Sequence, residues 1–309
     1  MPRNSFSERA LAEKVLKGDL RSASRLLTLV ENRDPAALPA LKILYPHTGK
    51  AHLIGVTGPA GVGKSTLINL LISAFRKKRK SVGVLAIDPS SPLTGGAILG
   101  DRLRMRPHFL DKGVFIRSLA TRGAWGGISP ALFDAIHILD AMGKEIIFIE
   151  TVGVGQDEVQ IARLAETLLL VLSPGIGDEV QILKAGLLEI GDIIAVNKGD
   201  LNEADLLVQQ LQETVLGRPI VKVAAAEEEG LSTLVSQLEK KLIENRSDRA
   251  RKINFVREEI QELLREALVQ EGLSDPLVAR QVERILSRKQ DPYSFIRSWM
   301  KKKGLKTFS

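Results

Sequence analysis

A glycine-rich turn that carries a lysine and a hydroxyl group is the first place in this sequence where chemistry is possible. The stretch GPAGVGKST begins at Gly58 and fits the pattern G-x-x-x-x-G-K-[ST]. The glycines let the backbone wrap an anion with its N–H groups, and the start of a helix adds partial positive charge. Lys64 can then reach phosphate oxygens, and the Ser65 hydroxyl can ligate Mg²⁺. The predicted phosphate-binding residues of this loop are Gly58, Ala60, Gly61, Val62, Gly63, Lys64, Ser65 and Thr66.

A second polar motif, NKGD, occupies residues 197–200 at the end of an apolar run. Asp200 can accept hydrogen bonds from two donors of guanine, N1–H and the exocyclic amine. Adenine has no such donor pair, so bound ATP would leave this carboxylate unpaired. Asn197 can hold guanine N7 or tie its own loop to the phosphate loop, and the aliphatic stem of Lys198 can cover the base. The motif predicts GTP rather than ATP as the nucleotide.

The stretch AAA at 224–226 is expected to be a further base contact. P-loop GTPases usually carry Ser-Ala in this place, where a backbone N–H meets guanine O6. Alanine replaces the serine here, but the contact is made by the main chain and tolerates the change. The predicted guanine-binding residues are Asn197, Lys198, Asp200 and Ala226.

A glutamate ends the apolar run 146–149, immediately before the turn TVGVGQ. In most P-loop GTPases the strand beside the phosphate-loop strand ends in Asp-x-x-Gly. That acid holds Mg²⁺ through water, and the glycine N–H meets the γ-phosphate. Glu150 and Gly153 occupy these two positions here. We therefore expect Glu150 to order the Mg²⁺ shell or the attacking water, and Gly153 to bind the γ-phosphate.

Two more carboxylates are candidates for contact with Mg²⁺ or with the attacking water. Asp88 ends the apolar run 82–88, and Asp101 lies in a Gly/Thr-rich segment that resembles a mobile switch. Asp101 can alternatively cap a helix that begins at Arg102. The predicted catalytic residues are Lys64, Glu150, Asp88 and Asp101, and the predicted Mg²⁺ ligands are Ser65, Asp88, Asp101 and Glu150. For Arg104, Arg117 and Arg122 we favour structural or partner-facing roles over charge stabilisation.

Seven short apolar runs must position these groups. Their apolarity is continuous rather than alternating, which is typical of strands buried on both faces. We predict an α/β fold: a mostly parallel P-loop NTPase sheet flanked by helices, with N-terminal and C-terminal helical extensions. The runs are 52–57, 82–88, 114–119, 145–150, 167–173, 192–197 and 219–224.

The sequence divides into three sections. Residues 1–50 form a predicted N-terminal helical extension, in which Ser7 is a candidate helix cap. Residues 51–248 form the predicted GTPase domain, and residues 249–309 a C-terminal helical arm. Apolar residues at helical spacing along 253–268 give this arm one apolar stripe, which can pack on its own domain or form a dimer surface. We expect the arm to make the chain a homodimer.

Composition and charge exclude several kinds of site. The 309-residue chain has no cysteine, so disulfides and cysteine-ligated metal centres are ruled out. Its four histidines are scattered, which argues against metal storage. The basic runs 76–80 and 301–303 fall at predicted helix ends, where cations complement the helix dipole. No aromatic residues interleave with them and no apolar run could span a bilayer, so we expect neither nucleic-acid nor membrane partners, and a cytoplasmic location.

Together these motifs resemble the MeaB/ArgK branch of the metallochaperone GTPases. A glutamate at position 150 combined with an intact NKGD is similar to that family as a whole, and longer stretches narrow the resemblance to the branch. Trp125 and the missing serine at 224–226 depart from the pattern. The stretches that carry the resemblance are IDPSSPLTGGAILGDRLRM (87–105), FIRSLATRGAWGGIS (115–129), ETVGVGQDE (150–158) and GDEVQILKAGLLEIGDIIAVNKGD (177–200).

The resemblance implies a Mg²⁺-dependent GTPase that accompanies an adenosylcobalamin-dependent acyl-CoA mutase, chiefly methylmalonyl-CoA mutase. It implies that GTP hydrolysis to GDP gates cofactor loading and protects the mutase from inactivation. Adenosylcobalamin would reach this chain only through the mutase. The resemblance also implies mobile switch segments at Gly153–Glu158 and Gly177–Lys184.

Three other functions remain open from the sequence. One is a nucleotide-dependent kinase or ATPase linked to lysine, arginine and ornithine transport, which NKGD argues against. Another is a binding module that holds nucleotide without turnover, which Lys64, Ser65 and Glu150 argue against. The third, an RNA-binding GTPase, lacks any RNA-binding module.

Overall fold

The structure is a computed structural model, and it describes most of the chain. The described residues are 5–88, 105, 107–108, 110–120, 129–151, 157–175, 186–245, 248–274, 284–285, 287 and 289–304. The chain divides into two compact units, Met1–Glu259 and Ile260–Ser309.

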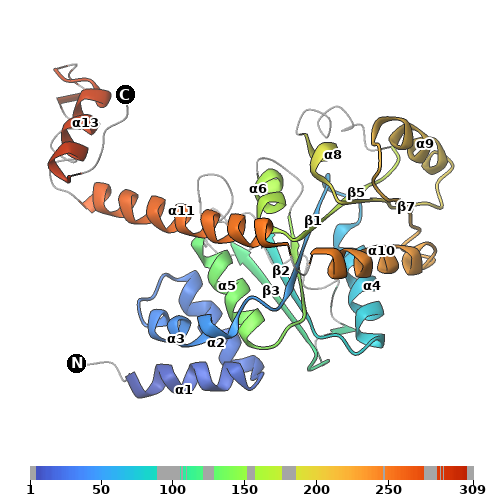
Figure 1. The fold of residues 1–309 in the computed structure, drawn as a ribbon, viewed down its shortest axis with the longest axis horizontal. Coiled ribbons are helices and arrows are strands. Elements are labelled where there is room, and N and C mark those ends of the chain that lie inside the picture. The colour runs from blue at the N-terminus through green and yellow to red at the C-terminus, as the bar shows by residue number, and fades with distance from the viewer. Residues whose placement is uncertain are drawn as a thin grey trace. The chain divides into compact units, whose positions relative to one another are not determined.

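The larger unit is built on a sheet of parallel strands (Figure 1). The described residues form seven strands in the order β3-β2-β4-β1-β5-β6-β7. Each strand lies within one predicted apolar run or extends it by one residue, and the predicted α/β fold is confirmed. The strands are β1 (His52–Thr57), β2 (Val82–Asp88), β3 (Val114–Ala120), β4 (Ile146–Glu150), β5 (Thr167–Leu172), β6 (Ile193–Val196) and β7 (Ile220–Lys222).

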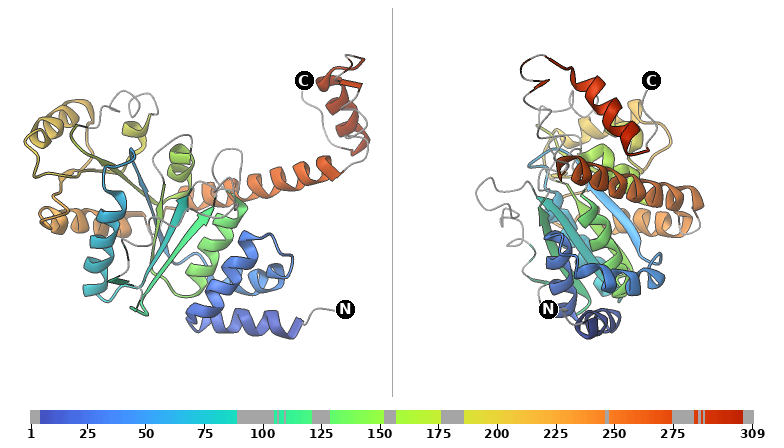
Figure 2. Two further views of the ribbon diagram at one scale, coloured as in Figure 1. Left: turned by 180° about the vertical axis from the view of Figure 1, so that it is seen from behind. Right: turned by 90° about the vertical axis from the view of Figure 1, so that its left-hand side faces the viewer.

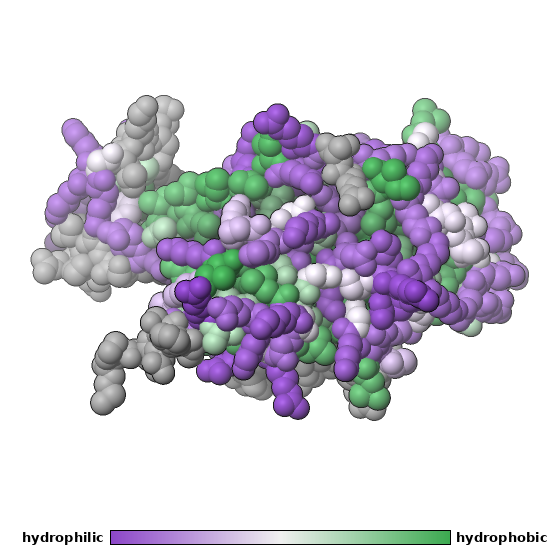
Figure 3. All heavy atoms as spheres, turned by 60° about the horizontal axis from the view of Figure 1, so that its bottom comes forward, coloured by the Kyte–Doolittle hydropathy of each residue, from purple (hydrophilic) through white to green (hydrophobic). Residues whose placement is uncertain are grey.

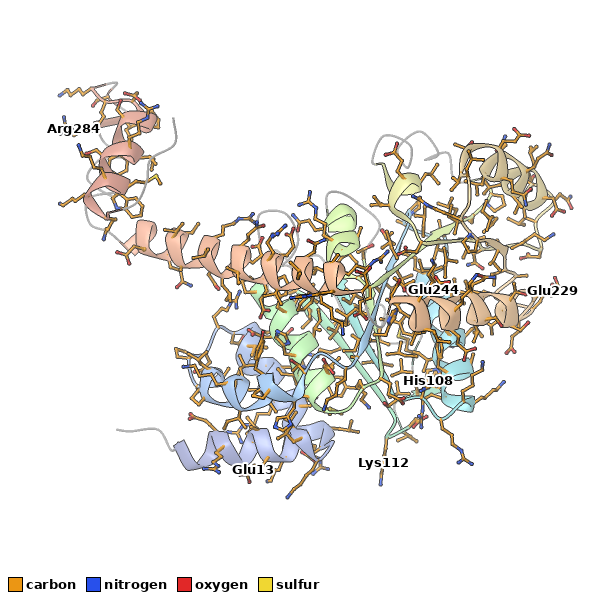
Figure 4. The ribbon with its side chains drawn as sticks, in the orientation of Figure 1. Glu13, His108, Lys112, Glu229, Glu244 and Arg284 are labelled. Carbon is orange, nitrogen blue, oxygen red and sulfur yellow. The ribbon has the colours of Figure 1, made fainter. Side chains whose placement is uncertain are left out.

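Helices cover both faces of the sheet (Figure 2). Alternate strand residues point to opposite faces, so Ile54 and Val56 join one core cluster while Leu53 joins another. Helices α4 (Lys64–Lys77) and α10 (Leu231–Glu244) pack on the first face, and Glu244, labelled in Figure 4, is the last residue of α10. Helices α5 (Pro130–Ala141), α6 (Asp157–Leu164) and α9 (Ala204–Thr214) cover the second face, and α8 (Leu187–Ile190) is a short helix before β6.

Three N-terminal helices belong to the core of the larger unit. Helices α1 (Ser5–Leu16), α2 (Leu20–Glu31) and α3 (Ala37–Leu44), followed by the 3-10 turn η1 (Tyr45–His47), share a hydrophobic cluster with α5. Asp19 caps α2, because its Oδ1 accepts a 2.7 Å hydrogen bond from the Ser22 N–H. Ser7 lies inside α1 rather than at its cap, so that expectation was wrong. Helix ends carry the weakest sequence signal.

The C-terminal section begins with the long helix α11 (Arg249–Ser274). The Phe255 ring on its first turns packs edge-on against Phe133 of α5, with the ring centroids 5.3 Å apart. Helix α13 (Pro292–Lys302) is capped by Asp291, whose Oδ1 accepts from the Ser294 N–H at 2.8 Å. Of the helices that the structure describes, none combines the length and the apolarity needed to cross a membrane.

Candidate functional site

The loop between β1 and α4 can be formed only with glycine at two of its positions. Gly58 has φ of 137°, and a Cβ there would lie 2.0 Å from the Val171 carbonyl oxygen of β5. Gly63 has φ of 92° and is the N-cap of α4, and a Cβ there would lie 2.4 Å from Asn197 Nδ2. These glycines therefore let the loop pass close to β5 and to the NKGD segment.

Lys64 is the first residue of α4, and its side chain folds back over the loop. It is 6% exposed, and its Nζ donates hydrogen bonds to the carbonyls of Gly58 at 2.7 Å and Pro59 at 2.8 Å. The ammonium group therefore lies over the same backbone that would cradle a phosphate. The partial positive charge of the α4 N-terminus adds to it.

Ser65 and Glu150 meet although 85 residues separate them. The parallel register pairs Val56 of β1 with Glu150, which puts the end of β4 beside the start of the loop. Ser65 Oγ donates to Glu150 Oε1 at 2.6 Å, and the two residues are 6% and 4% exposed. A hydroxyl and a carboxylate are hard oxygen donors of the kind that Mg²⁺ prefers, so this pair fits the predicted metal site.

Three predicted residues are only partly described or not described. The backbone of Asp88 ends β2, and the register of Ala86 with Glu150 puts it at the same edge of the sheet as Glu150. The side chain of Asp88 lies outside the described residues, as do Asp101 and Gly153. The assignments of these three residues stay predictions.

Asn197 ties the NKGD segment to the phosphate loop. Its side chain is 3% exposed, and Nδ2 donates to the Val62 carbonyl at 2.8 Å. Its backbone N–H donates to the Leu172 carbonyl at 2.7 Å, at the end of β5. The sequence allowed two roles for Asn197, and the structure contains the hydrogen bond that ties its loop to the phosphate loop.

The rest of NKGD packs against the segment that follows β7. The Gly199 N–H donates to the Val223 carbonyl at 3.0 Å, and a Cβ on Gly199 would lie 2.8 Å from Lys222 Cγ. Asp200 is exposed, and so is Ala226 on the adjoining loop. This contact keeps the two predicted guanine-binding segments side by side at the carboxyl edge of the sheet.

Comparison with known proteins agrees with this geometry. Residues 23–281 match the family described as Methylmalonyl Co-A mutase-associated GTPase MeaB. The chain belongs to this MeaB family.

Curated members and relatives support the assignment. A putative GTPase of Pyrococcus horikoshii is 56% identical over 65% of this chain and 63% of its own length. A probable GTPase of Mycobacterium tuberculosis is 39% identical over 74% of this chain and 73% of its own length. The GTPase ArgK of Escherichia coli is 36% identical over 63% of this chain and 61% of its own. The chain spans less than two thirds of the two Pyrococcus relatives that it matches, 63% and 60%.

A solved structure confirms the fold of this MeaB-family chain. The crystal structure of an LAO/AO transport system kinase covers 96% of this chain and 98% of its own, with a TM-score of 0.68 and 22% identity. At that identity the similarity speaks for the fold alone.

Sequence reasoning missed one residue at this edge. Ser173 directly follows β5 and is 6% exposed, and its Oγ has no hydrogen-bond partner among the residues that the structure describes. Its neighbours along the sheet are the ends of β1 and β6, which carry the phosphate loop and NKGD. The sequence signal was a serine that ends the apolar run 167–173.

Three histidines of this MeaB-family chain have contacts with residues outside the phosphate loop and NKGD. His52 begins β1 with its Nδ1 2.9 Å from Glu166 Oε2, and His108 lies beside α4 (Figure 4) with its Nε2 3.2 Å from the Asn69 carbonyl oxygen. His137 Nε2 lies 2.9 Å from Glu259 Oε1. Within the described residues no three histidine or acidic side chains gather into a metal-binding group.

Arg117 has a structural role, as expected. Its guanidinium pairs with Glu31 of α2 and donates to Thr28 Oγ1 at 3.2 Å. Arg104 and Arg122 lie outside the described residues.

Proposed function

We propose that this chain is a Mg²⁺-dependent GTPase that acts in the cytoplasm as a chaperone of an adenosylcobalamin-dependent acyl-CoA mutase, with methylmalonyl-CoA mutase as the first candidate. One observation carries the proposal: three motifs far apart in the sequence converge at one edge of the sheet. The Ser65–Glu150 hydrogen bond joins the phosphate loop to the acid after β4, and the Asn197–Val62 hydrogen bond joins it to NKGD. The description of the MeaB family supports the choice of client.

The reaction requires in-line attack of water on the γ-phosphate while the charge on its oxygens is neutralised. Lys64 would turn from the carbonyls of Gly58 and Pro59 to the phosphate oxygens, which it approaches from within the loop. The N–H groups at the start of α4 would bind the same oxygens. Glu150 would hold the attacking water or a water of the metal shell, and Ser65 would ligate Mg²⁺. When bound, Mg²⁺ would supply positive charge to the β- and γ-phosphate oxygens.

The base would be read by the loops after β6 and β7. Asp200 would accept from N1–H and the exocyclic amine of guanine, and the backbone N–H of Ala226 would donate to O6. Asp200 is exposed to solvent, so its carboxylate is open to a ligand. Adenosylcobalamin would be handled only in complex with the mutase.

The first experiment measures GTP and ATP turnover with and without purified methylmalonyl-CoA mutase. We expect turnover of GTP only, with a several-fold increase when the mutase is added. An unchanged GTP rate, with no complex between the two proteins, would remove the mutase as client. Equal turnover of ATP would overturn the reading of Asp200 and favour an ATP-using kinase.

A base-swap variant sharpens that experiment. Asp200→Asn places an amide N–H opposite a guanine donor, so GTP turnover should fall by at least about tenfold. Xanthosine triphosphate has a carbonyl where guanine has its amine, and its turnover should rise in the same variant. Glu203→Gln removes another acidic charge on the same loop and is the matched control. Equal effects of the two variants would contradict a base contact at Asp200.

The dimer is a second part of the proposal. Along α11 a band of hydrophobic side chains remains on the surface (Figure 3). Leu263 is 49% exposed and Leu264 is 57% exposed. Exposed apolar area of this extent is typical of an interaction surface, and a second copy of the same stripe is its simplest partner. The other exposed apolar residues of the stripe are Ile253, Val256, Ile260, Leu268 and Val269.

Light scattering at micromolar protein concentration tests the dimer. We expect dimers for the wild type and for the control Gln270→Ser, and monomers for Leu263→Ser/Leu264→Ser. A monomeric wild type would overturn this part of the proposal without touching the GTPase assignment.

A further inference from the structure

The N-terminal helices carry a basic groove that the GTPase site does not use. It lies between α1 and α2, has a volume of about 710 Å³, and is lined by Lys14, Lys17, Arg21 and Arg25 together with Asp19. The four basic side chains are exposed. Four cations face one carboxylate, so the groove is strongly positive.

The cations of this groove differ from their neighbours in lacking partners. Lys14, Lys17, Arg21 and Arg25 form no ion pair or side-chain hydrogen bond with a described residue. Asp19 acts on Lys14 and Arg21 through space, and its Oδ1 accepts from the Ser22 N–H. Cations nearby are paired: Arg9 of α1 with Glu13 at 3.3 Å, Arg33 just after α2 with Asp134 at 3.9 Å, and Arg117 of β3 with Glu31 of α2.

Helix stability explains the positions of the two lysines of the groove but not those of the two arginines. Lys14 and Lys17 lie at the end of α1, where a cation complements the helix dipole. Arg21 lies in the first turn of α2, where the dipole disfavours a cation, and this turn contains no acid. Arg21 and Arg25 are also four residues apart on one helix, where like charges repel. The two arginines therefore sit where the isolated helix would favour acidic or neutral residues.

The groove fits a protein better than a nucleic acid. Asp19 stands among the four cations and would repel the phosphate chain of RNA or DNA. Among the side chains that the structure describes, no aromatic one lines the groove for base stacking. An acidic protein segment can meet the cations with carboxylates and offer a neutral or basic group to Asp19. Such complementary charges favour fast, selective association.

We propose that the groove between α1 and α2 is the docking surface for an acidic segment of the client protein. The identity of that client rests on the proposed function. Docking there leaves the nucleotide edge of the sheet open, because none of the lining residues belongs to the phosphate loop or to NKGD.

The test compares two variants that each remove two positive charges. Arg21→Gln/Arg25→Gln removes two of the four cations of the groove, and Lys77→Gln/Lys112→Gln removes two exposed lysines on other parts of the surface. Affinity for purified methylmalonyl-CoA mutase is measured by calorimetry at low and high salt, and basal GTP turnover by phosphate release. Anisotropy with a labelled single-stranded RNA is the third readout.

We expect the groove variant to bind the mutase about fivefold to tenfold more weakly than the wild type at low salt. Its affinity should depend less on salt, since two screened contacts are gone. The control should bind like the wild type, and basal GTP turnover should be the same in all three.

Other outcomes would overturn the inference in distinguishable ways. Equal mutase affinity of the two variants would remove the groove as a docking surface and leave the proposed function intact. Absence of mutase binding by the wild type would remove the client, and this inference with it. RNA binding that is lost only in the groove variant would assign the groove to nucleic acid instead.

Discussion

The two edges of the sheet use polar residues in opposite ways. At the carboxyl edge, Lys64 and Asn197 donate to carbonyls of the phosphate loop and Ser65 donates to Glu150, around a place where a nucleotide can lie. At the amino edge, buried polar groups bind one another. Ligands of open α/β sheets lie beyond the carboxyl ends of the strands, so the amino edge is free to be optimised for stability.

Asp140 and His52 are two side chains at the amino edge whose polar atoms bind other groups of the protein. Asp140 of α5 accepts backbone N–H groups from Lys50 and, at 3.0 Å, Ala51, and so fixes the entry to β1. Burial raises the pKa of the Asp140 carboxyl, and these hydrogen bonds oppose the rise. His52 lies between Glu166 and Thr167, with its Nε2 2.8 Å from Thr167 Oγ1.

The difference between the edges predicts which substitutions should change GTP turnover and which should change the free energy of unfolding. Substitutions at the carboxyl edge should change turnover more than stability. Substitutions at the amino edge should do the reverse. Four variants test this comparison.

The largest effect is expected at Lys64. Lys64→Ala removes the cation at the phosphate loop, so kcat for GTP should fall about 10²- to 10³-fold. Thermal unfolding should shift little, because the hydrogen bonds of the lysine Nζ go to carbonyls of the same loop. The control is Lys77→Ala at the other end of α4. If Lys64→Ala kept wild-type turnover, the claim that the carboxyl edge serves the reaction would be contradicted.

The next effect concerns a second buried lysine, at the amino edge. Lys144 is 4% exposed, and burial lowers its pKa to about 8 from the model-peptide value of 10.5. Between these values the unfolded chain binds more protons than the folded chain, so Lys144 makes stability rise with pH. Below pH 8 its burial is a constant cost.

Lys144→Met should remove this dependence. The variant should gain up to ~3 kcal/mol over the wild type at pH 7, and the gain should shrink as pH approaches 10. Urea unfolding at several pH values, with kcat for GTP measured alongside, checks the prediction. A difference between variant and wild type that does not vary with pH would contradict the lowered pKa.

A smaller loss of stability is expected at Arg251. Its guanidinium donates to both carboxylate oxygens of Asp192, at 2.8 Å and 3.0 Å, and holds the start of α11 against the sheet. Arg251→Ala should cost about 2 kcal/mol of unfolding free energy and leave kcat for GTP unchanged. Arg249→Ala, at an exposed position nearby, is the control. A large drop in kcat with intact stability would mean that the amino edge serves the reaction.

The smallest effect is expected at Asn197, whose side chain connects the NKGD segment to the phosphate loop. Asn197→Ala loses the hydrogen bond to the Val62 carbonyl, so stability should fall by about 1 kcal/mol. The KM for GTP should rise about fivefold, because NKGD is no longer fixed to the phosphate loop. Asn202→Ala is the control. No change in KM would show that the tie is not needed for binding.

The strands could be predicted closely because seven apolar runs are buried on both faces, and burial leaves a plain mark on composition. The phosphate loop and NKGD could be found because their backbone geometry and hydrogen-bond donors require particular residues at fixed spacing. Ser173 was missed because one serine at the end of an apolar run has no distinguishing pattern. Ser7 was misplaced because helix ends depend on weak local preferences.

The sequence alone determined the parallel α/β fold and the residue types at the phosphate loop, since both follow from local chemistry and periodicity. Tertiary structure decided which of these residues meet. Strand order brought Glu150 beside Ser65, and the approach of β6 to the phosphate loop gave Asn197 its bond to Val62. The same packing left the cations between α1 and α2 without an ion-pair partner in the described part of the chain, because pairing depends on distances that close only when the chain has folded.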